Sequence, residues 1–145
     1  MDKGIYALVF RNGSCRLTVG SLGEVRFRRG WHVYVGSARG PGGLARVRRH
    51  RRLSIARDRA PKWHVDHLLV SPFFSLHAIV CGPTGKDLEC SLAGALGGGC
   101  VPSFGSGDCA CEGHLFYRPK DPGKEIMEAM AGLGLKPVST TLIKG

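Results

Sequence analysis

The stretch 31–52, WHVYVGSARGPGGLARVRRHRR, constrains this chain more than any other. Its first residues alternate between apolar and polar side chains as a strand does, and they place Tyr34 on the face opposite Val33 and Val35. The residues GPGG then interrupt any regular element. In the basic helix predicted to follow, Arg46 and His50 are four residues apart and share one face. Regular elements therefore carry a Tyr, an Arg and a His, and such elements hold side chains more rigidly than loops do.

The positive charge of the chain is concentrated in and after this stretch. Its 21 Lys and Arg outnumber its 11 Asp and Glu, which gives a net charge of +10. Such a surface attracts polyanions, and nucleic acid is the commonest polyanion in the cytoplasm. The alternative is a solvated basic helix that only keeps the protein soluble. The candidate nucleic-acid contacts are Arg39, Arg48, Arg49, Arg51 and Arg52.

The length of 145 residues and the hydrophobic fraction of 43% predict one folded domain with its own core. No apolar run is long enough to cross a bilayer. The N-terminal residues lack the small-residue cleavage site of a signal peptide. We therefore expect a cytoplasmic protein without a membrane partner, and in that compartment its six cysteines should be reduced.

The pattern of strands and helices predicts an α/β fold of the α+β type, in which helices flank a small antiparallel or mixed β-sheet. Asn12-Gly13 is a strong turn signal, so residues 15–19 are expected to pair back on the first strand. The domain is predicted to span residues 1–118, with residues 119–145 forming a C-terminal helix and strand-like extension packed on it. The expected strands are 4–10, 15–19, 25–27, 31–35, 76–81, 114–117 and 135–143, and the expected helices begin near residues 44, 62, 87 and 122.

Several sequence blocks resemble the GIY-YIG nuclease superfamily. Gly4-Ile5-Tyr6 and Tyr34-Val35-Gly36 match its two signature strands, and the R-x-x-x-H spacing of the following helix matches phage homing endonucleases. The longer blocks GWHVYVGSARGPGGLARVRRH, KWHVDHLL, LECSLA and FGSGDCACEGHLF are similar to the stand-alone Uri-type, or GIY-YIG-like, subfamily. Relative to the superfamily, residues 12–30 form an insertion, and the family Asn has no counterpart after Glu89.

The resemblance implies an endonuclease that hydrolyses phosphodiester bonds, in DNA more than in RNA, with Mg²⁺ or Mn²⁺. It assigns Tyr6 as general base, Tyr34 as the residue that positions water or phosphate, and Glu89 as the carboxylate that holds the metal. Arg46 would bind phosphate oxygens, and His50 would either assist proton transfer or contact phosphate. We expect Tyr6 and Tyr34 on one sheet face, with Arg46 and Glu89 approaching that face from two helices.

Two alternatives remain open. The first is a non-catalytic nucleic-acid-binding module that retains the fold and the basic helix. The second is a structural zinc protein whose basic surface binds protein partners, with Cys109, Cys111 and His114 as ligands; that spacing is not a standard zinc-finger spacing. His64, Asp66 and His67 also invite a metal interpretation, but a hydrogen-bonded structural histidine beside Trp63 is the preferred one. The GPTGK sequence at residues 82–86 lacks the spacing of a phosphate-binding loop.

Overall fold

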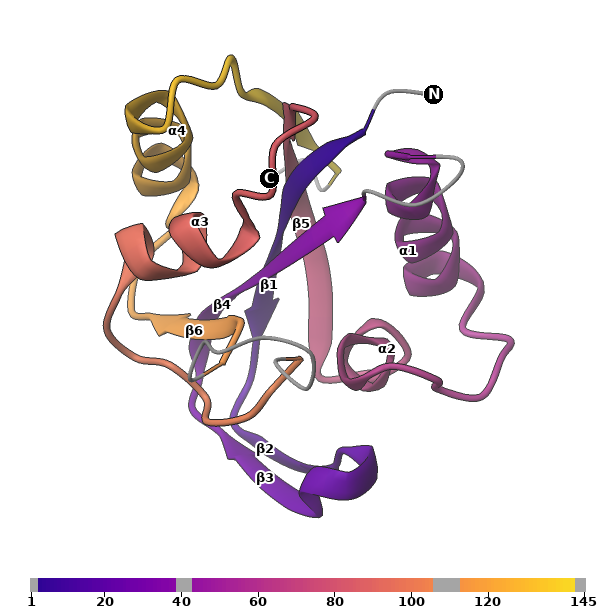
Figure 1. The fold of residues 1–145 in the computed structure, drawn as a ribbon. Helices are drawn as coiled ribbons and strands as arrows, with labels where there is room; N and C mark the ends of the chain where they lie inside the picture. The colour runs from indigo at the N-terminus through magenta and orange to yellow at the C-terminus, as the bar shows by residue number, and fades with distance from the viewer. Residues whose placement is uncertain (1–2, 39–42, 106–112, 143–145) are drawn as a thin grey trace.

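A computed structural model of the chain describes residues 3–38, 43–105 and 113–142 (Figure 1). None of the helices in these ranges is long and apolar enough to cross a bilayer. In chain order the elements are β1 (Gly4–Asn12), β2 (Cys15–Thr18), the 3-10 helix η1 (Gly20–Leu22), β3 (Glu24–Phe27), β4 (Gly30–Ala38), α1 (Ala45–Ala56), α2 (His64–Leu69), β5 (Phe74–Pro83), α3 (Glu89–Leu96), β6 (Leu115–Arg118), α4 (Gly123–Gly132) and β7 (Val138–Thr141).

The main sheet has the strand order β6-β4-β1-β5-β7, and every neighbouring pair in it is antiparallel. The first strand of the chain therefore lies at the centre, hydrogen-bonded to β4 on one side and to β5 on the other. This arrangement confirms the predicted fold class, a small antiparallel sheet flanked by helices.

The two faces of the sheet are covered by different helices (Figure 1). Buried side chains alternate along β1 because successive strand residues point to opposite faces. Residues 6, 8 and 10 belong to the cluster that includes α1 and α2, whereas residues 5, 7 and 9 belong to the cluster that includes α3 and α4. Because β1 is covered on both faces, its sequence is a continuous apolar run and does not alternate between apolar and polar residues.

The residues between β1 and β4 form a separate two-stranded ribbon at one end of the sheet. The prediction that residues 15–19 pair with β1 is wrong, because β4 and β5 occupy both edges of that strand and β2 pairs only with β3. Asn12 supports the junction: its side-chain amide donates to the Arg28 carbonyl at 3.0 Å, and its oxygen lies 2.8 Å from Nδ1 of His32.

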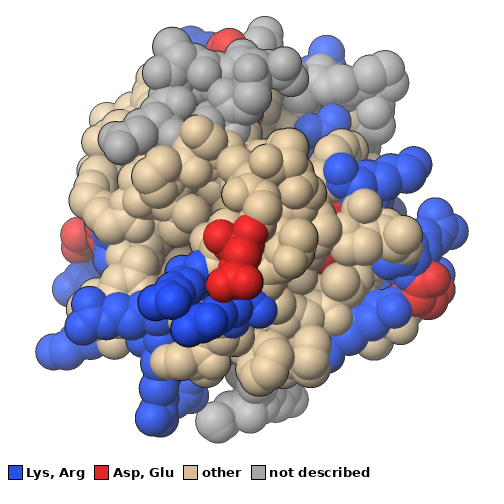
Figure 2. All heavy atoms as spheres, turned by 90° about the horizontal axis from the view of Figure 1, so that it is seen from below, with Lys and Arg blue, Asp and Glu red and all other residues tan. Residues whose placement is uncertain are grey.

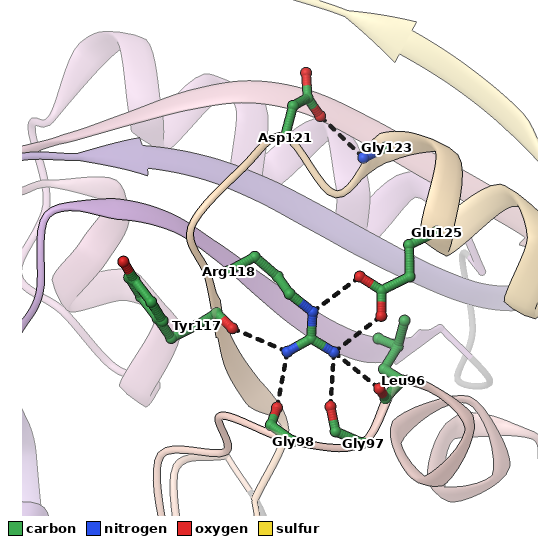
Figure 3. Close-up of polar contacts among 8 residues, drawn as sticks. All are labelled: Leu96, Gly97, Gly98, Tyr117, Arg118, Asp121, Gly123 and Glu125. Carbon is green, nitrogen blue, oxygen red and sulfur yellow. Dashed lines mark hydrogen bonds and ion pairs between the residues drawn. The ribbon is translucent and has the colours of Figure 1, made fainter.

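The C-terminal residues continue the same architecture, since β7 pairs with β5 and α4 packs beside α3. Arg118 joins the elements at this side of the fold (Figure 3). Its guanidinium donates to both carboxylate oxygens of Glu125 on α4, at 2.8 and 3.0 Å. It also donates to the backbone carbonyls of Leu96, Gly97, Gly98 and Tyr117.

The glycine run 97–99 makes this arrangement feasible. All three glycines have positive φ, a conformation that costs residues with a Cβ free energy. The turn exposes the last carbonyls of α3, which lack partners within the helix, and Arg118 satisfies them with a charge that complements the helix dipole.

Replacing Arg118 by Ala should lower the free energy of unfolding by about 2–3 kcal/mol, measured by urea denaturation. The side chain is only 16% exposed, so its loss leaves several carbonyls and the Glu125 carboxylate without their partner. Glu125 is 42% exposed, and water therefore reduces the penalty. Arg118→Lys should recover little of it, because an ammonium lacks the planar fork. Equal stability of Arg118→Ala and the exposed comparison variant Lys120→Ala would contradict this expectation.

Candidate functional site

Tyr6 and Tyr34 lie on the same face of adjacent strands. Tyr6 on β1 pairs with Gly36, and Tyr34 on β4 pairs with Leu8. Paired residues point to the same side of the sheet, as do residues two apart on one strand, so both tyrosines face α1 and α2. The ring of Tyr6 packs directly on Gly36, where an added Cβ would collide with it. Gly36 on β4 therefore makes room for the ring of Tyr6 on β1.

Tyr6 is paired with His50 across the space between β1 and α1. The Tyr6 hydroxyl lies 2.9 Å from Nε2 of His50, and the two ring centroids are 5.4 Å apart. Burial raises the pKa of Tyr6 well above its ordinary value of 10, and burial lowers the pKa of His50 to about 4. His50 is therefore neutral at physiological pH, and with its hydrogen on Nδ1 it can accept the phenol proton at Nε2.

Arg46 stands beside this pair. Its guanidinium donates to the Ser37 carbonyl at 2.8 Å and lies 5.2 Å from the centroid of the Trp63 ring. After burial and the neighbouring Tyr34, Arg46 has the next largest influence on the Tyr6 pKa, and it opposes the rise. A fixed cation thus lies near a buried phenol, where it favours any negative charge that develops.

Glu89 begins α3, where the helix dipole favours a carboxylate. Its Oε1 lies 2.7 Å from Nδ1 of buried His114. Burial, followed by the Glu89 charge, raises the pKa of Tyr34 to about 12. The same charge also raises the pKa of Tyr6, so Glu89 acts electrostatically on both tyrosines.

The path of the Glu89 helix differs from the expected one. Leu92, Ala93 and Leu96 of α3 pack on the sheet face opposite the tyrosines. Glu89 was expected to approach the face of the tyrosines from its helix, and α3 itself lies on the other face because its apolar stripe covers that side of β1. Only the first residue of the helix places a carboxylate within electrostatic range of Tyr34.

The arginines of α1 fall into two groups. Arg49 forms two hydrogen bonds with the fully buried Asp66, at 3.1 and 3.2 Å, and Arg52 pairs with Asp58 at 3.0 Å. Arg48 and Arg51 are exposed and form no ion pair with any residue that the structure describes. Of the predicted nucleic-acid contacts, these two are the ones free to meet a phosphate, while Arg49 supports the fold and Arg39 lies outside the described residues.

Asp66 and Trp63 were not predicted as parts of the site, and they organise its outer side. Asp66 accepts the backbone N–H groups of Lys62 and Trp63 at 2.9 and 3.2 Å, which caps α2. Burial acts to raise the Asp66 pKa, but the hydrogen bonds from Arg49 and the backbone outweigh it and hold that pKa below its usual range. The capping spacing was a usable sequence signal, whereas nothing in the sequence links Trp63 to Arg46.

The alternative metal groups are not brought together in the described residues, among which no three His, Cys, Asp or Glu side chains converge. Cys109 and Cys111 lie outside those residues, and His114 contacts Glu89. His64 accepts the Gly105 backbone N–H at 2.8 Å, in agreement with a structural role. The expectation that all cysteines are reduced is wrong at Cys90, which is disulfide-bonded. Sequence spacing does not reveal which thiols a fold brings within bonding distance.

Residues 5–135 match a family described as a domain of unknown function, DUF123. Neither a curated protein nor a solved structure matches the chain. The matched range runs from β1 through α4, so it includes Tyr6, Tyr34, Arg46, His50 and Glu89. Because it covers most of the chain, the protein belongs to the DUF123 family.

Proposed function

We propose that this protein is a divalent-metal-dependent endonuclease that hydrolyses phosphodiester bonds in nucleic acid, with DNA preferred to RNA. The observation that supports the proposal most is the Tyr6–His50 contact, with Arg46 beside it and Glu89 in electrostatic range. These are the residue types and the order along the chain that the GIY-YIG resemblance requires. A cytoplasmic location is part of the proposal, and the disulfide at Cys90 is the observation against it.

The residues supply a consistent path for the proton. A water oxygen attacks phosphorus, and the bond from phosphorus to the leaving oxygen breaks with its electron pair on that oxygen, which takes a proton from solvent. The proton of the attacking water passes to the Tyr6 oxygen. Tyr6 simultaneously gives its own proton to Nε2 of neutral His50, so no free phenolate forms. This relay removes the difficulty that burial creates, because a phenol with a raised pKa is seldom ionised. Arg46 stabilises the charge that accumulates on the phosphate oxygens.

Glu89 fits the chemistry of a Mg²⁺ ligand. Its side chain is 22% exposed and carries a carboxylate at a helix terminus. Mg²⁺ is commonly held by one or two carboxylates while it retains several waters. When bound, the metal would stabilise negative charge on the phosphate and the leaving oxygen.

The deciding experiment is nicking of supercoiled plasmid with Mg²⁺ or Mn²⁺ against EDTA. Wild-type protein should nick the plasmid only with metal, and Glu89→Ala and Glu89→Gln should lose activity while retaining affinity for the plasmid. Glu128→Gln, an exposed acid on α4, is the matched control and should behave as wild type. Nicking by Glu89→Ala at the wild-type rate would refute the role of Glu89.

A non-catalytic nucleic-acid-binding module is the second candidate. Two observations favour it: Tyr6 is only 2% exposed beneath Gly36, and the sole Asn of the chain, Asn12, lies at the end of β1. Absence of metal-dependent cleavage on plasmid, branched DNA, single strands and RNA, with binding intact, would establish this candidate instead.

Neutralising the two unpaired arginines of α1 should weaken binding of duplex DNA and flatten its dependence on salt. Each lost phosphate contact reduces the steepness of the fall in log K with log salt concentration by ~0.9, so Arg48→Gln/Arg51→Gln should reduce it by about 1.8. The comparison variant Lys120→Gln/Lys124→Gln removes the same charge from the α4 side of the fold and should retain the wild-type slope. An unchanged slope in the α1 variant would show that these arginines form only a solvated face.

A further inference from the structure

The β2–β3 ribbon carries a basic surface that the proposed site does not use. Figure 2 looks at the end of the molecule where this ribbon lies and shows Lys and Arg side chains gathered beside a small acidic area. All arginines of the ribbon and of the residues that adjoin it in the chain are exposed. We name them the ribbon arginines: Arg11, Arg16, Arg26, Arg28 and Arg29.

Two of the ribbon arginines face each other in a way that costs stability. Arg16 on β2 is directly opposite Arg26 on β3, and like charges in such cross-strand positions repel. The nearby acid, Glu24, lies 3.9 Å from Arg16, and both side chains are about 60% exposed, so the ion pair is worth little. The other face of the ribbon already serves the core through Leu17 and Val25. The fold itself therefore has no use for the charged face.

Two further ribbon arginines are held in place by aromatic rings. The Arg11 guanidinium lies 5.6 Å from the Trp31 ring centroid, and that of Arg28 lies 5.3 Å from the Tyr117 ring centroid. Tyr117 is itself fixed by donating its hydroxyl proton to the Arg29 carbonyl at 2.9 Å. Such stacking orders a guanidinium before an anion arrives, which lowers the entropic cost of binding.

We propose that the ribbon arginines form a second nucleic-acid contact, which binds backbone phosphates of a duplex outside the segment held at Tyr6. The proposal rests on the nucleic-acid substrate of the proposed function and extends it. Asn12 lies six residue steps along β1 from Tyr6, or about 20 Å at ~3.3 Å per residue. At ~3.4 Å per base pair this length corresponds to about six base pairs. A protruding two-stranded ribbon also suits the width of a major groove.

The proposal is tested by duplex binding in EDTA, which removes cleavage from the measurement. Arg16→Gln/Arg26→Gln and wild type are titrated with a fluorescent 30-base-pair duplex over a range of KCl concentrations. In the variant, the fall of log K with log salt concentration should be less steep by about 1.8, while Arg16→Lys/Arg26→Lys should restore most of the steepness. Lys120→Gln/Lys124→Gln is the matched control and should leave the slope unchanged.

Three results would overturn the proposal: a wild-type slope in the ribbon variant, an equal loss in the Lys120/Lys124 control, or an effect confined to binding of anionic phospholipid vesicles. The melting temperature distinguishes weaker DNA binding from a loss of folding. For Arg16→Gln/Arg26→Gln it should not fall, because the substitution removes a repulsive pair. Arg28→Gln/Arg29→Gln provides a second variant with the same expected slope. If wild type never cleaves but the ribbon variant binds more weakly, the nuclease proposal fails and the ribbon contact stands.

Discussion

Tyr6→Phe should reduce the single-turnover rate of plasmid nicking by ~10²-fold or more while leaving the affinity for DNA nearly unchanged. The substitution retains the ring that packs on Gly36 and removes only the hydroxyl that contacts His50. Arg46→Ala should reduce both rate and affinity, because a guanidinium contacts phosphate in the ground state and more strongly in the transition state. Glu128→Gln, which alters an exposed side chain on α4, is the control and should behave as wild type.

The proton relay predicts that substitutions of His50 and Tyr6 have non-additive effects on the rate. If Tyr6 passes its proton to His50, the two residues act as a unit, and residues acting as a unit are not additive. His50→Gln and Tyr6→Phe should then each cost ~10²-fold, and the double variant should cost little more than either. The wild-type rate should also show no loss between pH 7.5 and pH 5.5 due to His50, because its pKa of about 4 keeps it neutral there. Multiplicative losses in the double variant would refute the relay.

Acidification from pH 7.5 to pH 5 should lower the free energy of unfolding by about 4 kcal/mol through two buried histidines. Burial lowers the pKa of both His32 and His50 to about 4, against ~6.5 in an unfolded chain. As the pH falls below 6.5, the unfolded chain binds protons that the folded chain does not, so stability decreases until about pH 4. The carboxylate of Asp66 does not act in this window, because its pKa is lowered rather than raised.

Urea denaturation at a series of pH values measures the effect. His32→Gln and His50→Gln should each flatten the pH dependence by about half, since each removes one of the two groups. Near neutral pH both variants lose packing and a hydrogen bond, so only the slope with pH is diagnostic. A free energy of unfolding that is constant from pH 7.5 to pH 5 would show that these histidines are hydrated in the folded state.

The local periodicities were sufficient to predict the fold class, most elements and the common face of the two tyrosines. Alternation along β1 and the 3.6-residue period of α1 follow directly from which side chains need burial. The strand partners of β1 could not be predicted in the same way. The Asn12-Gly13 turn indicated a hairpin between β1 and residues 15–19, but β4 and β5 occupy both edges of β1. Long-range competition of this kind leaves no local signal in a sequence.

The same limit applies to the site. The sequence indicated Arg46 and His50 through their helical spacing, and the structure places both beside Tyr6. It offered no means of predicting that Arg49 would be committed to Asp66 or that Glu89 would contact His114, since each pair is distant in the chain. Charge alone did not distinguish arginines available for a phosphate from those that hold the fold together.

The central position of β1 has a consequence for synthesis of the chain. β1 can pair with β4 soon after Ala38 is made, but its other edge waits for β5, which ends at Pro83. At ~5–20 residues per second, that edge of a strongly apolar strand remains open for several seconds on the nascent chain. Contacts so distant in sequence also make folding slow. The nascent chain is therefore most prone to aggregation in the period before β5 is synthesised.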